Sequence, residues 1–272
     1  MNIFQPTSTL HPLRFLALAC LITLSETLLA AETDSIRKHI ENLSDPNVLA
    51  RTNACHSLGQ ASEKDQAIAL DALLDAMRDP SGTVRGAAVQ AIGNMGPGAA
   101  RAIPRLIDIY RDGSISKTAI INALVRIGPD SPAVIDLLME VVRGGRSGSV
   151  RPMSNSQYPL QLRHEAIHAV ERIGPKANKA VPVLLDLLAM TAADIEHQWF
   201  TFGETVEALS IVGVGDKRVF TAIKRLQQGK GLPAKSKNTQ SYDNAILAAD
   251  SALKRLQKFE KNNNSPIEKE KP

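Results

Sequence analysis

The residues most suggestive of chemistry form a short motif at 163–168, Arg-His-Glu-Ala-Ile-His. His164 and His168 are four residues apart, so in a helix both imidazoles lie on one face and can share a metal ion. Glu165 would then act as general base, as in the HExxH pattern of zinc peptidases. If Ile167 faces the core, the two histidines and Glu165 lie on the open side of the helix. The motif therefore raises a zinc-dependent hydrolase as one hypothesis for residues 164–168.

A catalytic zinc needs a third protein ligand, and the motif does not supply one at the usual place. The extended form of the pattern requires Gly at 171 and His at 174, where this sequence has Glu171 and Gly174. The segment 117–122, Lys-Thr-Ala-Ile-Ile-Asn, aligns with 163–168 and carries no metal ligand. We therefore expect a repeated helix sequence that matches HExxH by coincidence. We assign no catalytic residue, metal or cofactor, and His164 and His168 are the candidates if a metal does bind.

The helices that would position these residues recur along the chain. An apolar residue followed by Gly closes five segments, with spacings of 34, 35, 46 and 39 residues, at Gly59, Gly93, Gly128, Gly174 and Gly213. Before four of these glycines stands a Leu/Ile-rich segment with helical spacing, sometimes behind a proline. This pattern predicts that each unit consists of a first helix (A) and an Ala-rich second helix (B) that ends at glycine. One such hairpin cannot bury its apolar face alone, so we expect about six of them to stack.

Composition supports an all-α protein. The chain has 272 residues, of which 4% are aromatic and 2 are cysteines, which excludes a disulfide-stapled scaffold. No stretch shows sustained period-two alternation, so no strands are expected. The formal net charge is +4, which is compatible with an acidic partner.

The turns between the helices carry a second pattern. Asp45-Pro46 is followed by Arg51, and Asp79-Pro80 is followed by Arg85. With the repeat spacing, these residues resemble the HEAT and HEAT-like (phycocyanobilin-lyase-type) repeats over residues 34–258. The resemblance implies an α-solenoid, a superhelix with a groove lined by the B helices, and a ladder of turn Asp and helix Arg along the stack. It implies a structural role for these arginines, and some relatives act as lyase-like helpers of other proteins.

The two ends of the chain are expected to lie outside the repeats. An apolar run of ten residues at 15–24 follows Arg14, which is too short for the roughly 20 residues that span a bilayer. This pattern predicts that residues 1–31 are a signal peptide with a cleavage site near Ala30 or Ala31. The alternative is that they form an uncleaved membrane anchor. Export places the protein in the periplasm or outside the cell, in contact with a membrane only through this segment. The repeat domain is expected at 32–259 and a disordered tail at 260–272.

Three inserted segments are expected to be loops between A and B helices, along one edge of the solenoid. Residues 143–160 and 227–241 each carry three cations and no acid, and residues 191–203 contain the only tryptophan. Basic and aromatic side chains suit an acidic segment of another protein, and export argues against nucleic acid. The predicted partner-binding residues are Arg143, Arg146, Arg151, His164, His168, Trp199, Phe200, Phe202, Lys230 and Lys235.

The sequence thus predicts an exported HEAT-repeat binding or scaffold protein. It would bind another protein through its concave groove and the A–B loop edge. The zinc hydrolase at residues 164–168 is one alternative. An accessory subunit or lyase-like helper is the other.

Overall fold

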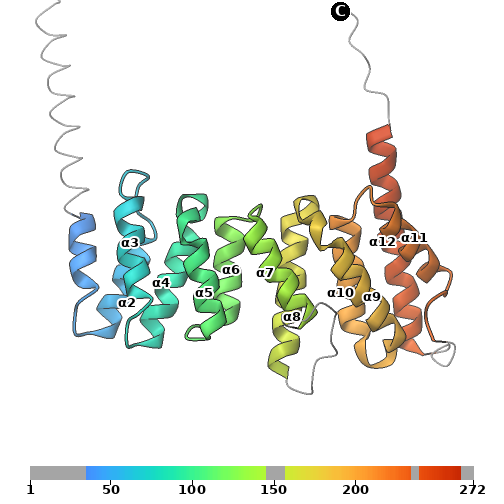
Figure 1. The fold of residues 1–272 in the computed structure, drawn as a ribbon, viewed down its shortest axis with the longest axis horizontal. Coiled ribbons are helices and arrows are strands. Elements are labelled where there is room, and N and C mark those ends of the chain that lie inside the picture. The colour runs from blue at the N-terminus through green and yellow to red at the C-terminus, as the bar shows by residue number, and fades with distance from the viewer. Residues whose placement is uncertain (1–34, 145–156, 234–238, 265–272) are drawn as a thin grey trace, which may run out of the picture. The chain divides into compact units, whose positions relative to one another are not determined.

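The computed structural model describes residues 35–144, 157–233 and 239–264, and within these ranges the chain is helical and has no strand (Figure 1). The first helix covers residues 35–42. The helices that follow are α2 (Val48–Leu58), α3 (Gln66–Ala76), α4 (Gly82–Asn94), α5 (Ile103–Asp112), α6 (Lys117–Ile127), α7 (Pro132–Arg143), α8 (Gln157–Ile173), α9 (Val181–Ala193), α10 (Ile195–Val212), α11 (Lys217–Gln227) and α12 (Gln240–Asn264). Two 3-10 helices, η1 (Gly96–Ala102) and η2 (Gly174–Ala180), precede α5 and α9.

In the described part of the chain these helices form six A–B hairpins, which confirms the predicted all-α repeat architecture. The chain divides into two compact units, residues 1–91 and residues 92–272. The first unit holds the hairpin of residues 35–42 with α2, and α3 with most of α4. In the second unit α5 pairs with α6, α7 with α8, α9 with α10, and α11 with α12. Helices from successive hairpins also pack on each other there, as α8 does on α10 and α10 on α12.

The structure confirms the predicted helix end at four of the five glycines. Gly59, Gly128, Gly174 and Gly213 each directly follow the last residue of a B helix. α4 instead continues past Gly93 to Asn94. A Cβ atom on Gly93 would lie 3.0 Å from Cα of Ala123 in α6, so the glycine allows close approach of the two B helices. The recurrent glycine therefore marks close helix packing as well as helix termination.

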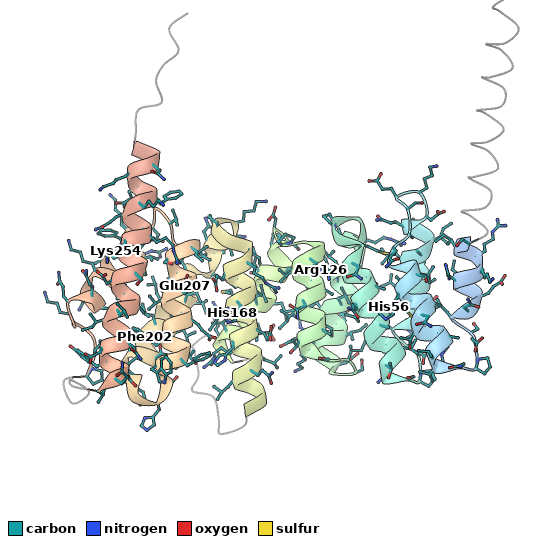
Figure 2. The ribbon with its side chains drawn as sticks, turned by 180° about the vertical axis from the view of Figure 1, so that it is seen from behind. His56, Arg126, His168, Phe202, Glu207 and Lys254 are labelled. Atoms are coloured by element: carbon teal, nitrogen blue, oxygen red, sulfur yellow. The ribbon has the colours of Figure 1, made fainter. Side chains whose placement is uncertain are left out.

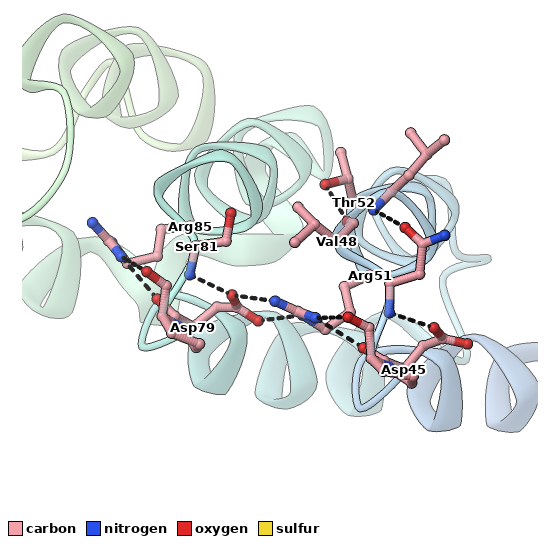
Figure 3. A network of polar contacts seen from close by, with 11 residues as sticks. Asp45, Val48, Arg51, Thr52, Asp79, Ser81 and Arg85 are labelled. Atoms are coloured by element: carbon pink, nitrogen blue, oxygen red, sulfur yellow. Dashed lines mark hydrogen bonds and ion pairs between the residues drawn. The ribbon is translucent and has the colours of Figure 1, made fainter.

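The ladder expected in the turns is present in the first unit (Figure 3). Arg51 donates from Nε and Nη2 to the carboxylate of Asp79 in the next repeat, at 2.7 and 3.0 Å. Its Nη1 donates to the carbonyl of Asp45 at 2.8 Å, which fixes its own turn. The Arg51 guanidinium is the largest influence that lowers the pKa of Asp79. The Asp79 side chain also accepts from the backbone N–H of Ser81 at 2.7 Å, so this residue joins a turn to a neighbouring repeat.

The same turn recurs before α6, where the sequence pattern missed it. Asp112 accepts from the backbone N–H of Ser114 at 2.7 Å, as Asp79 does from Ser81. Asp112 precedes Lys117 by five residues instead of six, so the fixed spacing of the first two repeats does not find it. Arg163, which stands at a similar place in α8, is 1% exposed, so it is a core residue. Its burial lowers its pKa to about 10.

Three predicted boundaries differ from the structure. The expected loop at 191–203 is almost entirely helix, because α9 runs to Ala193 and α10 begins at Ile195. Helices occupy both ends of the expected loop at 143–160, since Arg143 ends α7 and α8 begins at Gln157. α12 continues past residue 259 to Asn264, over residues assigned to the tail.

Other predicted segments lie outside the described residues. These are the signal peptide predicted at 1–31, residues 145–156 of the basic segment 143–160, and residues 265–272 of the predicted tail. No helix in the described ranges is long and apolar enough to cross a membrane.

Candidate functional site

The candidate site lies on two neighbouring B helices, α8 and α10, which carry His168 and Phe202 in Figure 2. The helical wheel predicted for α8 is confirmed, because Ala166, Ile167 and Val170 are fully buried. His168 lies on the open side with 53% of its side chain exposed, and His164 is partly buried at 26%. The two histidines thus project from α8 toward the neighbouring helix α10.

A glutamate from α10 joins the two histidines. Nε2 of His168 lies 3.1 Å from Oε1 of Glu204, and Nε2 of His164 lies 3.7 Å from Oε2. Nε2 of His164 also lies 3.1 Å from the hydroxyl of Thr201, and Nδ1 of His168 lies 3.2 Å from Glu171. The Glu204 side chain is only 9% exposed, and its Oε2 makes no hydrogen bond within the described part of the chain. These contacts fasten one B helix to the next.

Sequence reasoning missed Glu204 because it lies in the following repeat, 36 residues after His168. A signal for it did exist. When the repeats are aligned on their closing glycines, Glu204 precedes Gly213 by nine residues, as Glu165 precedes Gly174. Alignment of the B helices on these glycines would have placed the two glutamates at equivalent positions on adjacent helices.

The arrangement of these side chains bears on the zinc alternative. Among the described residues no group of three or more His, Cys, Asp and Glu side chains is placed to hold a metal ion. Glu171, which stands where the extended motif requires Gly, pairs with Nδ1 of His168. Nε2 of His164 lies at hydrogen-bonding distance from the hydroxyl of Thr201. The HExxH match therefore gains no support as a hydrolase from the geometry.

Burial shifts the pKa of two residues of the cluster, His164 and Glu204. Desolvation is the largest influence that lowers the pKa of His164, and the charges of His168 and Arg163 add to it. Desolvation also raises the pKa of Glu204, partly offset by its interactions with His168. Both shifts favour the neutral forms, as expected where ionisable groups leave water.

The His164 shift makes stability depend on pH. Because its folded-state pKa lies below the ordinary 6.5, the unfolded chain takes up this proton first as pH falls. The free energy of unfolding should therefore fall as pH drops through 6.5, and less so in His164→Gln. Urea unfolding at pH 7.5 and 6.0 measures both proteins. Parallel pH dependence in the two would contradict this explanation.

The aromatic residues of 191–203 divide into two environments. Trp199 and Phe200 are 46% and 53% exposed, whereas Phe202 is 1% exposed. Phe202 was predicted to bind a partner, and this is wrong because its side chain lies on the buried face of α10. Phe202 shares a buried face with Val206 and Leu209, four and seven residues further along α10.

The exposed rings are in contact with each other. The centroids of Trp199 and Phe200 are 5.9 Å apart in an edge-on arrangement, and those of Phe200 and His164 are 5.1 Å apart. We call His164, Trp199 and Phe200 the aromatic patch. Helix α10 bends just before it, since Gln198 has non-helical angles of φ −120 and ψ 16. The aromatic patch thus joins α8 to α10 and leaves two large rings open to solvent.

The predicted basic residues are not brought together in the described part of the chain. Arg143 is half-buried at the end of α7, and Lys230 is exposed after α11. Arg146, Arg151 and Lys235 lie outside the described residues. Arg143 and Lys230 therefore belong to separate hairpins.

Comparisons with known proteins address the fold. Residues 36–119 match the family model of HEAT repeats. No curated protein matches the sequence. Two crystal structures of engineered proteins are 16% and 17% identical over 83% and 82% of this chain and 97% and 98% of theirs, with TM-scores of 0.49 and 0.48. A designed armadillo repeat protein is 16% identical over 79% of this chain and 98% of its own, with a TM-score of 0.44.

The family match and the molecule's own features agree. The matched residues include both Asp-Pro turns and the Arg51–Asp79 pair between repeats. The described helices beyond them continue as hairpins of the same type. The described part of the chain is therefore an all-α helical repeat, and residues 36–119 of it resemble HEAT repeats.

Proposed function

We propose that this protein is an exported binding protein that holds another protein through the aromatic patch on α8 and α10. The single observation that carries the proposal is the exposure of Trp199 and Phe200, two large rings in mutual contact. Trp is strongly enriched among the residues that dominate binding energy at protein interfaces. Large apolar surfaces left open to water commonly mark such interfaces.

Contacts with neighbouring side chains hold the aromatic patch in place, as an interface anchor requires. His164 contacts the Phe200 ring and is itself held near Thr201 and Glu204. These side chains come from two helices, so the rings rest on the junction between two repeats. A ring fixed in this way loses little conformational freedom when a partner covers it.

The partner is proposed to present acidic as well as apolar groups. Basic residues at Arg143, Arg146 and Arg151 and at Lys230 and Lys235 favour carboxylates over cations. The apolar run at 15–24 supports export, which makes a protein of the periplasm or the exterior the expected partner. Nucleic acid is not proposed.

The proposal is tested by site-specific crosslinking in the native envelope. A photo-reactive phenylalanine analogue at position 200 should capture a defined protein on illumination. The matched control is the same analogue at Phe259, another exposed phenylalanine, which is 40% exposed on α12. Capture of one partner from position 200 and not from 259 supports the proposal. No adduct at 200, or the same adducts at both positions, would reject it.

A further inference from the structure

A second surface lies on the A helices, away from the aromatic patch. α9 and α11 leave a groove of 220 Å³ between them. Its walls include Leu188 and Ala192 from α9 and Ala222 and Leu226 from α11. Three of these lining residues, Leu188, Ala192 and Leu226, are only 3%, 4% and 6% exposed, so they also belong to the packed core. We call them the apolar floor of the groove.

Two cations border this apolar floor. Arg225 and Lys230 line the groove and are both exposed. Within the described part of the chain neither has a carboxylate at ion-pair distance. From Lys217 to Thr239 the sequence has seven Lys or Arg side chains and no Asp or Glu. Asp186, the acid of α9, does not line the groove. The rim therefore offers positive charge that no carboxylate of the described residues neutralises.

The size of the groove narrows the choice of occupant. Small-molecule sites are usually about 300–1,000 Å³ in volume. This groove is smaller, at 220 Å³, and it is open along one side. Such a space suits one large apolar side chain that projects from another polypeptide. Carboxylates on either side of that side chain would reach Arg225 and Lys230, which adds charge complementarity to the apolar contact.

We infer that the groove between α9 and α11 binds an acidic segment of a partner protein, with one apolar anchor side chain on Leu188 and Leu226 and carboxylates on Arg225 and Lys230. The inference rests on the proposed function, because it assumes that the chain binds a protein. It deepens that function by assigning a chemistry and a second contact to the partner. The aromatic patch takes no part in it.

The test begins with selection of a displayed library of random 12-residue peptides on the full-length protein. Enriched peptides should contain Leu, Phe or Ile flanked by Asp or Glu. Their affinity, measured by fluorescence anisotropy with labelled synthetic copies, should fall about tenfold or more in Arg225→Glu/Lys230→Glu and with added salt. Ala189→Trp should also weaken binding, because Ala189 is an exposed residue of the groove lining and the new ring fills it.

The matched control has the same change of charge elsewhere. Lys224→Glu/Lys258→Glu replaces two exposed lysines that do not line the groove, and should change affinity less than about twofold. The inference would be overturned if the enriched peptides were neutral or basic, or if no peptide were enriched. It would also be overturned if both double variants lowered the peptide affinity equally. Binding of decanoate without any displayed peptide would overturn it in favour of an acyl chain.

The two proposals fail separately. Peptides that bind the groove should bind Trp199→Ala/Phe200→Ala unchanged, since these residues belong to the aromatic patch. A crosslinked partner at position 200 together with an inert groove leaves the proposed function intact and rejects the groove. Groove-binding peptides without any crosslinked partner reject the aromatic patch and support the groove.

Discussion

Phe202→Ala should lower the free energy of unfolding by about 3–5 kcal/mol, the usual cost of removing a buried aromatic ring. Phe202 is 1% exposed, and truncation leaves a cavity between α10 and its neighbours that cannot fully collapse. Trp199→Ala and Phe200→Ala should change stability by no more than about 0.5 kcal/mol, because their rings already face water. Urea unfolding followed by circular dichroism compares the three variants without depending on tryptophan fluorescence.

This contrast tests the helical path of residues 195–212. If the segment were a loop, the three aromatic residues would have similar surroundings and their variants similar stabilities. Equal losses for Phe200→Ala and Phe202→Ala would therefore contradict the structure of α10. A larger loss of stability in Phe202→Ala than in the other two variants would assign Phe202 to the core. It would leave Trp199 and Phe200 as the residues available for binding.

Gly59→Ala should destabilise the first unit by about 1–3 kcal/mol, the cost of overpacking a well-packed site. The backbone of Gly59 has ordinary right-handed angles of φ −67 and ψ −10, so an added methyl group is not strained by conformation. It would, however, lie 2.8 Å from Cα of Ala91 in α4, too close for carbon atoms. The expected loss thus measures how closely α2 approaches α4.

Gly86→Ala is the matched control and should have the opposite sign. Gly86 lies within α4, and a methyl group there meets nothing within 4 Å. Ala in a helix interior is more stable than Gly by about 0.5–1 kcal/mol. Thermal unfolding of the two variants checks both values. A stabilising Gly59→Ala, or losses of equal size at both positions, would show that the close approach is absent.

The sequence predicted the repeats well because their determinants are local. Closing glycines, Ala-rich B helices and the Asp45 and Arg51 turn are visible within one unit of the sequence. The partner that Arg51 finds, Asp79, was predictable because it recurs at the same place in the next unit. The number of hairpins in the described ranges follows from this periodicity.

The longer repeats were less predictable for a physical reason. Their extra residues were expected in loops, but those that the structure describes lengthen helices, so α8 and α10 have 17 and 18 residues against 11 in α6. Helix α10 also absorbs a bend at Gln198, which no period in the sequence signals. The predicted loop residues Trp199 and Phe200 therefore became part of a helix face.

The candidate site was only half visible in the sequence. His164 and His168 stand out as a motif within one helix. Glu204, which joins them, contributes from the next repeat, and this contact depends on the packing of α8 against α10. The groove between α9 and α11 has the same origin, since its walls come from two hairpins. Sites between repeats need the register of neighbouring helices, which a single repeat does not encode.

The central claim is that the exposed aromatic patch is covered by a partner protein. Trp199 is the only tryptophan in the sequence, so its fluorescence reports on the patch alone. The most direct measurement is acrylamide quenching of Trp199, first in the free protein and then with the partner captured at position 200. We expect strong quenching in the free protein, since this side chain is 46% exposed, and clear protection in the complex. Weak quenching in the free protein, or quenching unchanged by a saturating partner, would contradict the claim.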